Sequence, residues 1–340
     1  MRFESEYAHR PSERFLQCHC SSIAECASGD LLVAFYAGSH EGQPDVAVVT
    51  VRKPAGAGAW EPPVIVSDTP GKPEGNCTLF AHPAGRLFLF YGTHERRPRE
   101  DDPSQERWMI RNQKLKVSTD NGHTWSDDIV ISEHWGFLFR NKPIVLSNGD
   151  IIVGLEDALG RCSRFLISED RGETWFYSEP VLGIPNEQPT LIQRKDGSLL
   201  ALLRPREPQS IAESRRRIGR AESFDNGRTW VNVRWTDLPN HGAAFDMVKL
   251  RDGRPPYVGL AFNNSEVDRS VLTLALSEDE GETWSHMRDL ERPPGSYEYP
   301  AIIQDRAGLL HVTYSVGPRT LNRDHIKHVC VSPEWIPTGA

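Results

Sequence analysis

The sequence of 340 residues lacks long apolar runs, a hydrophobic leader and a dense set of cysteines. Its longest apolar stretches have the length of a β-strand, so a membrane-spanning helix and a membrane partner are not expected. Residues 1–7 contain no hydrophobic region of a secretory signal, and six cysteines without a framework indicate reduced thiols, so we predict a cytoplasmic location. The net charge of −8 comes without a basic stripe, which argues against nucleic acid as a partner.

The sequence also lacks amphipathic helical patterns, but it contains a repeated phrase. The phrase Ser-x-Asp-x-Gly-x-Thr-Trp occurs four times, at 118–125, 168–175, 223–230 and 277–284. Its Asp can bind the backbone two residues on, its Gly accepts a positive φ, and its Trp can fill the space between neighbouring units. The copies start 50, 55 and 54 residues apart, a spacing typical of a repeat architecture.

Two more markers give the number of units. Trp60 and Trp335 continue the spacing of the phrase without its other residues. A glycine followed by an apolar run occurs six times, at Gly29, Gly85, Gly149, Gly197, Gly253 and Gly308. With a short apolar strand before each glycine, every unit has four strands. We therefore predict an all-β, six-bladed β-propeller with four antiparallel strands per blade, formed as one domain by residues 1–340. The tryptophans of the four phrases should be buried between outer strands.

The phrase resembles the Asp-box, or BNR repeat, of the sialidase (neuraminidase) superfamily, where it joins two outer strands of a blade. The resemblance implies a sialidase-like glycosidase, a hydrolase of carbohydrate metabolism. Asp-boxes lie on the rim of the propeller, so they indicate the fold and not the reaction. The reaction must be argued from other residues.

Polar residues open the predicted first strands of the blades. First strands line the axis of a propeller, so polar side chains at their starts converge on one face, which is the default place for a site. We expect substrate-binding roles for Arg140, Asn141, Lys142, Gln188 and Asp246 from this position. No metal is expected, because Cys18, His19 and Cys20 alternate sides along a strand and cannot converge. No cofactor is expected either.

The family resemblance assigns further roles. Arg204 and Arg269 match the second and third of three arginines that bind the substrate carboxylate, since guanidinium forks suit a planar carboxylate. His19 stands in place of the first arginine, and Arg140 or Lys142 are the candidates to replace it. Tyr299 matches the nucleophilic tyrosine.

Two of the family's catalytic carboxylates are altered. Gln188 stands in place of the glutamate that serves as base, and an amide cannot take a phenolic proton. Glu41 is the nearest match to the acid/base aspartate, with Asp45 as the alternative. The missing arginine and base predict weak hydrolysis of ordinary sialosides and better turnover of another acidic glycoside, such as a uronate.

Three functions remain open. The first is an exo-acting hydrolase of an acid-bearing sugar, in a small molecule or oligosaccharide, with Glu41 or Asp45 as acid, two arginines as carboxylate ligands and Tyr299 at the anomeric carbon. The second is a uronate-specific lyase, in which His19 removes the α-proton and Tyr299 is the acid. The third is a carbohydrate-binding propeller without catalysis, which Gln188 favours.

Overall fold

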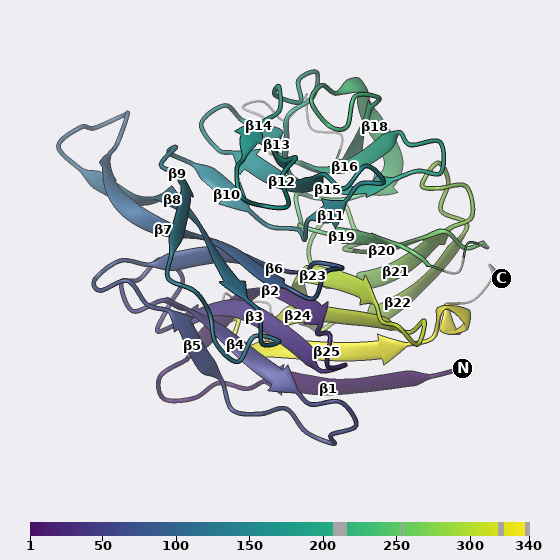
Figure 1. The fold of residues 1–340 in the computed structure, drawn as a ribbon, viewed down its shortest axis with the longest axis horizontal. Coiled ribbons are helices and arrows are strands. Elements are labelled where there is room, and N and C mark those ends of the chain that lie inside the picture. The colour runs from purple at the N-terminus through teal and green to yellow at the C-terminus, as the bar shows by residue number, and fades with distance from the viewer. Residues whose placement is uncertain (207–215, 252, 254, 319–322, 337–340) are drawn as a thin grey trace.

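The protein folds as a ring of β-sheets, as the computed structural model shows, because each sheet contacts its two neighbours and the last contacts the first. Figure 1 views this ring from the side, with the strands running across the picture. The structure describes residues 1–206, 216–251, 253, 255–318 and 323–336. There are six sheets, each with antiparallel neighbours, which confirms the predicted six-bladed β-propeller. The described residues include one short 3-10 helix, η2 (Pro333–Trp335), and no helix that is long and apolar enough to cross a membrane.

The blades are numbered in chain order, and each begins with its inner strand. Blade one contains β2 (Gln17–Glu25), β3 (Leu31–Gly38), β4 (Ala47–Lys53) and β5 (Val64–Ser67). Blade two contains β6 (Glu74–Ala81), β7 (Leu87–Pro98), β8 (Glu106–Ser118) and β9 (Ile129–Ser132). Blade three contains β10 (Phe137–Phe139), β11 (Ile144–Val145), β12 (Ile151–Asp157), β13 (Cys162–Ser168) and β14 (Phe176–Tyr177).

The second half of the ring follows the same plan. Blade four contains β15 (Asn186–Gln193), β16 (Leu199–Pro205), β17 (Arg217–Ser223) and β18 (Val231–Pro239). Blade five contains β19 (Asp246–Lys249), β20 (Val258–Phe262), β21 (Leu272–Ser277) and β22 (His286–Glu291). Blade six contains β23 (Gly295–Gln304), β24 (Leu310–Pro318) and β25 (His325–Val331), and its outer strand is β1 (Phe3–His9).

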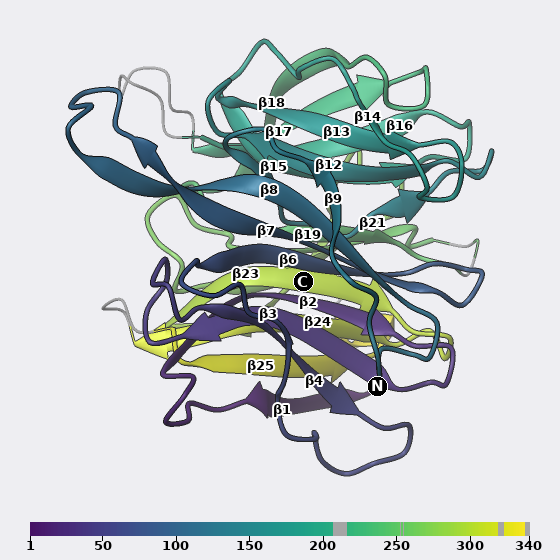
Figure 2. The same ribbon diagram turned by 60° about the vertical axis from the view of Figure 1, so that its left-hand side comes forward.

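The N-terminal strand closes the ring. β1 pairs antiparallel with β25, with Phe3 opposite Val331, so both ends of the chain build the same blade (Figure 2). No motif in the N-terminal strand predicts this closure. It places β2, the first inner strand of the chain, directly beside β23, the last one. Residues near position 20 and near position 300 therefore share one side of the channel.

The Asp-boxes form turns held by their own side chains. In the first box, the Ser118 hydroxyl donates to Asp120 Oδ1 at 2.8 Å and accepts from the Gly122 amide at 2.8 Å, while the Thr124 amide donates to Asp120 Oδ1 at 2.9 Å. The other three boxes repeat these bonds. The box is therefore a local unit specified by its own sequence.

The box tryptophans pack between blades to different depths. Trp230 is buried and stacks on Phe165 of blade three, with ring centroids 4.1 Å apart. Trp125, Trp175 and Trp284 are half-buried against the apolar clusters beside them, so the prediction that all four are buried is wrong for three of them. Their rings still cover the apolar edge of a blade but keep one side toward solvent.

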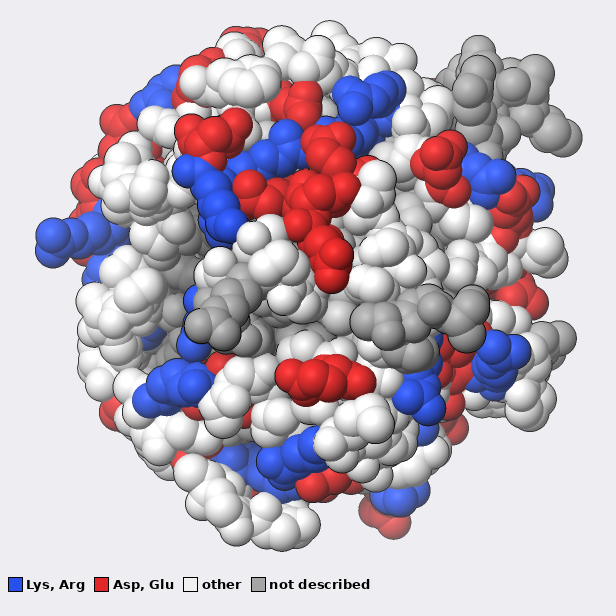
Figure 3. Space-filling model, turned by 90° about the vertical axis from the view of Figure 1, so that its right-hand side faces the viewer, with Lys and Arg blue, Asp and Glu red and all other residues white. Residues whose placement is uncertain are grey.

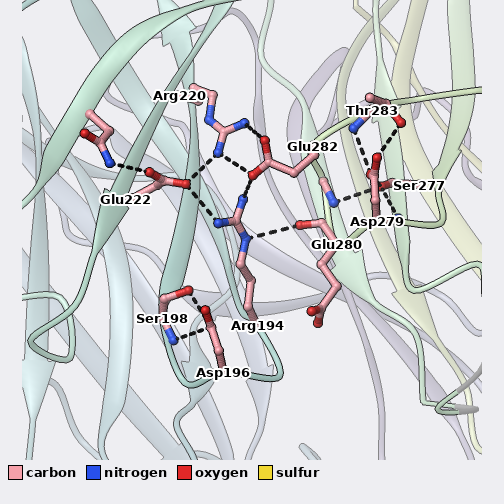
Figure 4. Close-up of polar contacts among 12 residues, drawn as sticks. Arg194, Asp196, Ser198, Arg220, Glu222, Ser277, Asp279, Glu280, Glu282 and Thr283 are labelled. Carbon is pink, nitrogen blue, oxygen red and sulfur yellow. Dashed lines mark hydrogen bonds and ion pairs between the residues drawn. The ribbon is translucent and has the colours of Figure 1, made fainter.

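Ion pairs also join neighbouring blades, and Figure 4 shows the network between blades four and five. Arg220 of β17 donates from Nη1 to Glu282 Oε2 at 2.7 Å, and Glu282 belongs to the Asp-box of blade five. Arg194 donates from Nη1 to Glu222 Oε1 at 2.9 Å and also pairs with Glu282. The boxes thus lie at the face where the inner strands end, away from the starts of those strands.

Candidate functional site

The inner strands carry bulges at the same level of the channel. The pairing register shifts in β2, β6, β15 and β23. Each bulge holds one non-glycine residue with a positive φ: Cys20 at 59°, Asn76 at 44°, Gln188 at 45° and Tyr299 at 53°. In β15 and β23 the next residue is a proline, which has no N–H to donate to the ladder. Bulges of this kind redirect side chains and are frequent beside active sites.

Tyr299 is the meeting point of four other blades. The guanidinium carbons of Arg140, Arg204 and Arg269 lie 5.1, 5.6 and 5.7 Å from the centre of its ring. The His19 ring lies 4.3 Å away, centroid to centroid, at an angle of 70°. Cations at this range are attracted to the face of an aromatic ring. The phenol therefore sits in a strongly positive environment.

The Tyr299 hydroxyl contacts a cation where the family resemblance predicts a carboxylate. Arg204 donates from Nη1 to this hydroxyl at 3.1 Å and to Gln188 Oε1 at 2.7 Å. Gln188 in turn donates from Nε2 to Glu156 Oε2 at 2.9 Å. Burial, and then the nearby Glu187 carboxylate, raise the pKa of Glu156 to about 7. The amide of Gln188 thus separates the tyrosine side of the site from a carboxylate behind it.

A chain of alternating charges runs from blade five to blade one. Glu298 pairs with Arg269, and it accepts from Arg323 Nε at 2.8 Å. Arg323 also donates from Nη1 to Glu41 Oε2 at 2.6 Å, and Glu41 Oε1 accepts from the Tyr36 hydroxyl at 2.6 Å. Arg323 precedes β25, next to blade one in the closed ring. Besides Arg204 and Arg269, it is a third half-buried guanidinium, and it contacts Glu41.

His19 is neutral and nearly enclosed. Its Nδ1 lies 3.0 Å from the Ser315 hydroxyl, and its Nε2 has no hydrogen-bond partner in the described part of the chain. An acidic atom, Glu298 Oε2, lies 4.0 Å from Nε2. Burial, and then the charges of Arg323 and Arg269, hold the pKa of His19 well below its usual range. The imidazole can accept a proton, but 3% exposure leaves little access to it.

Two predicted substrate ligands pair with each other instead. Lys142 donates from Nζ to Asp246 Oδ2 at 2.7 Å and to the Met247 carbonyl at 2.9 Å. Asp246 also accepts from the Thr190 hydroxyl at 2.8 Å and from the Ile302 amide at 3.0 Å. These bonds join blades three, four, five and six across the channel. The substrate-binding roles of both residues stay predictions, and in this arrangement their charged atoms bind protein partners.

Three other candidates are also engaged in holding the fold. Arg140 donates to the Pro300 carbonyl at 2.8 Å, and Asn141 donates to the Pro189 carbonyl at 3.1 Å. Asp45 accepts from the Ser39 amide at 2.9 Å and shapes the loop in which Glu41 lies. Arg140 still contributes its charge below Tyr299, whereas Asn141 and Asp45 are structural in this arrangement.

Four charged residues near Tyr299 were not predicted from the sequence: Glu156, Glu187, Glu298 and Arg323. Glu187 and Glu298 could have been found, because each directly precedes a bulge residue and its proline in the same repeat position. Glu156 is the last residue but one of β12, the second strand of blade three, and no sequence motif marks it. Arg323 has no counterpart in the residues that carry the resemblance, and only the closure of the ring by β1 places it beside blade one.

The groups around Tyr299 are partly open to solvent. Tyr299 and the arginines at 204, 269 and 323 are half-buried, and Glu41 is exposed. A small hollow of about 10 Å³ is bounded by His19, Tyr36, Glu41 and Arg323. A ligand can therefore reach these side chains from solvent.

Comparison with known proteins agrees with the architecture. A protein of unknown function from Dyadobacter fermentans superimposes with a TM-score of 0.77 at 18% identity, covering 97% of this chain and 98% of that one. The intramolecular trans-sialidase of Ruminococcus gnavus gives 0.75 at 14% identity, with 97% of both chains covered. The NanB sialidase of Streptococcus pneumoniae gives 0.74 at 13% identity, covering 98% of this chain and 71% of that one.

At these identities the likeness shows the fold alone, and the sequence has no significant match among curated proteins. The family is shown by the sequence itself. A model of the BNR repeat-like domain matches residues 29–312, which is most of the chain. This sialidase-like propeller therefore belongs to the BNR repeat-like domain family.

Proposed function

We propose that this protein is an enzyme that processes a glycoside of an acid-bearing sugar, most simply as an exo-acting hydrolase. One observation carries the proposal: two partly exposed guanidiniums, from Arg204 and Arg269, lie 5.6 and 5.7 Å from the centre of the Tyr299 ring, and a third, from Arg323, shares Glu298 with Arg269. Guanidiniums grip a carboxylate with paired hydrogen bonds, so an acidic sugar fits this face better than a neutral one.

Glu298 affects how strongly these guanidiniums can bind a carboxylate. It pairs with Arg269 and Arg323 in the free site, and it therefore holds both guanidiniums in place before a ligand arrives. Each guanidinium has five N–H donors, so a substrate carboxylate can share them with Glu298. Because part of the positive charge is already balanced, binding should be selective for planar anions and not for anions in general.

In the proposed hydrolysis, Glu41 gives a proton to the glycosidic oxygen as the bond from that oxygen to the anomeric carbon breaks. The Tyr299 oxygen stabilises the positive charge that develops on the anomeric carbon, and a water then adds to that carbon and returns a proton to Glu41. Arg204, at 3.1 Å from the Tyr299 hydroxyl, stabilises negative charge on that oxygen. Glu41 is exposed and held by Tyr36 and Arg323, which supports its proposed role as the acid.

A uronate lyase is the second candidate, and the unpartnered Nε2 of His19 favours it. In this reaction His19 would take the α-proton, the leaving oxygen would depart with the proton of Tyr299, and a carbon–carbon double bond would form. The imidazole is neutral, as a base must be. Its burial counts against it, because a base has to reach the substrate carbon.

Product analysis tests the proposal. The protein is incubated with a panel of fluorogenic sialosides and uronides and with unsubstituted acidic oligosaccharides. Hydrolysis releases a reducing sugar, whereas elimination gives an unsaturated product that absorbs in the ultraviolet. Because Gln188 replaces the family base, we expect uronides to be turned over better than sialosides. Saturable binding without turnover of any member of the panel would contradict the enzyme proposal and support a carbohydrate-binding propeller.

A further inference from the structure

A second cavity opens at the other end of the channel, away from Tyr299. It encloses about 400 Å³. Its wall is formed by the last residues of the inner strands, and every blade contributes at least one aliphatic side chain: Ile23, Leu79, Val145, Ile192, Val248 and Ile303. The Asp-boxes lie on this face, which Figure 3 shows and which is the right-hand side of Figure 1.

The rim of this cavity carries an excess of positive charge. Lys249 and Arg251 line the cavity, together with Glu25 and with Lys142, whose charge is paired with Asp246. Glu25 is balanced by Arg306, whose Nε lies 3.1 Å from Glu25 Oε1. Lys249 donates to the Gln193 carbonyl, a neutral group, and so keeps its net charge. The Arg251 side chain has no hydrogen-bond or ion-pair partner among the described residues. Among the described residues, Lys249 and Arg251 are therefore two cations at the mouth without an acidic partner.

Lys249 and Arg251 differ from the paired charged side chains on the surface around the cavity. Acidic and basic side chains are intermixed over the face in Figure 3, and many of them pair across blades. Cavities of several hundred Å³ with apolar walls and a few polar groups are typical of small-molecule sites. Aliphatic walls hold water poorly, since a buried water needs several polar partners.

We propose that this cavity binds a small amphiphilic carboxylate, with its apolar chain inside and its carboxylate at the rim beside Arg251 and Lys249. The chain would replace poorly held water against six aliphatic side chains, which is favourable in proportion to the apolar area covered. The carboxylate would stay at the mouth, where it remains partly hydrated and needs no costly burial. This site is independent of the sugar chemistry proposed for the opposite face.

Titration calorimetry with decanoate tests the proposal, and 1-decanol serves as the uncharged counterpart. We expect saturable binding of one decanoate per chain and weaker binding of decanol. Arg251→Ala should weaken decanoate about two- to fivefold, the range of an exposed ion pair, and leave decanol unchanged. Arg292→Ala removes an equal charge from a side chain that is 78% exposed and does not line the cavity, so it should change neither ligand.

Variants with a larger side chain in the cavity wall provide a second test of the proposal. Val248 lies in its wall and is only partly buried, so Val248→Phe should abolish decanoate binding while the melting temperature stays close to that of the wild type. Ile303→Phe serves in the same way if the first variant does not fold. Unchanged binding in a folded filled variant would overturn the assignment of the cavity. Equal binding of decanoate and decanol, or no loss in Arg251→Ala, would overturn the assignment of an acidic ligand.

Discussion

Arg204 and Tyr299 are joined by a hydrogen bond of 3.1 Å from the guanidinium Nη1 to the phenolic oxygen. The same nitrogen donates to Gln188 Oε1, where the family resemblance predicts a carboxylate base. A guanidinium cannot remove a proton, but it stabilises negative charge on an oxygen that it contacts. The chemistry of this tyrosine therefore depends on a cation rather than on a neighbouring base.

Arg204→Ala should lower kcat/KM for the preferred acidic glycoside about 10- to 100-fold. The reason is the loss of a charge-assisted hydrogen bond, which contributes about 1.5–3 kcal/mol. Tyr299→Phe should abolish turnover and leave binding of the sugar nearly unchanged, because it removes the oxygen and keeps the ring. Steady-state kinetics and calorimetry with the product sugar measure the two effects. Arg292→Ala is the control, and equal activity in Arg204→Ala and the control would contradict the role of Arg204.

Arg323 should matter more for substrate binding than His19. Arg323→Ala removes a half-buried guanidinium that contacts both Glu41 and Glu298, so we expect KM to rise about tenfold, the effect of one charged hydrogen bond. His19→Ala removes a neutral, buried ring and should leave KM within about threefold and cost stability instead. A large loss of kcat in His19→Ala, with Arg323→Ala unaffected, would favour the lyase mechanism.

Trp230→Ala should destabilise the protein by about 3–5 kcal/mol in urea denaturation, because it removes a buried ring stacked on Phe165. Trp125→Ala should lower the free energy of unfolding by about 1–2 kcal/mol, since that ring is half-buried. The two variants carry the same substitution at equivalent positions of two Asp-boxes, so each is the control for the other. Equal losses would mean that burial does not set the contribution of these tryptophans.

The fold could be predicted from the sequence because its signals are local. An Asp-box contains its own turn bonds, such as that from the Ser118 hydroxyl to Asp120, and six glycine turns repeat at similar spacing. Ring closure was not predictable in this way. The pairing of Phe3 with Val331 joins the two ends of the chain, and no motif in β1 indicates which strand it pairs with.

Parts of the candidate site could be predicted from the repeat and from the family resemblance, which pointed to Arg204 and Arg269 beside Tyr299. Tyr299 and Gln188 stand before a proline at equivalent positions, and both lie at bulges near the centre. Lys142 and Asp246 share the level of these bulges, but their charges attract each other across the channel, which a position along a strand does not reveal. Arg323 reaches the site from a loop before the last strand, so its role follows from the closed ring and not from the repeat.

Glu156 gives the fold a dependence on pH. Burial and the Glu187 carboxylate raise its pKa to about 7, well above the usual value of 4.5 for a glutamate. Between these two values the folded state binds more protons than the unfolded state, so stability falls as pH rises through this range. Glu156→Gln removes the charge and keeps an oxygen that can accept from Gln188 Nε2. We therefore expect the variant to be more stable than the wild type at pH 8, by about 2 kcal/mol, and nearly equal to it at pH 5.

Urea denaturation of both proteins at pH 5, 6, 7 and 8 measures this difference. Glu173→Gln is a suitable control, because its side chain is 73% exposed and its charge is screened by water. It should show no such trend with pH. The advantage of Glu156→Gln should grow from pH 5 to 7 and then level off, since above the folded-state pKa both states have lost the proton. An advantage that is constant across the series would mean that Glu156 is ionised in the folded protein at pH 5, held so by Arg206 or by the Gln188 amide.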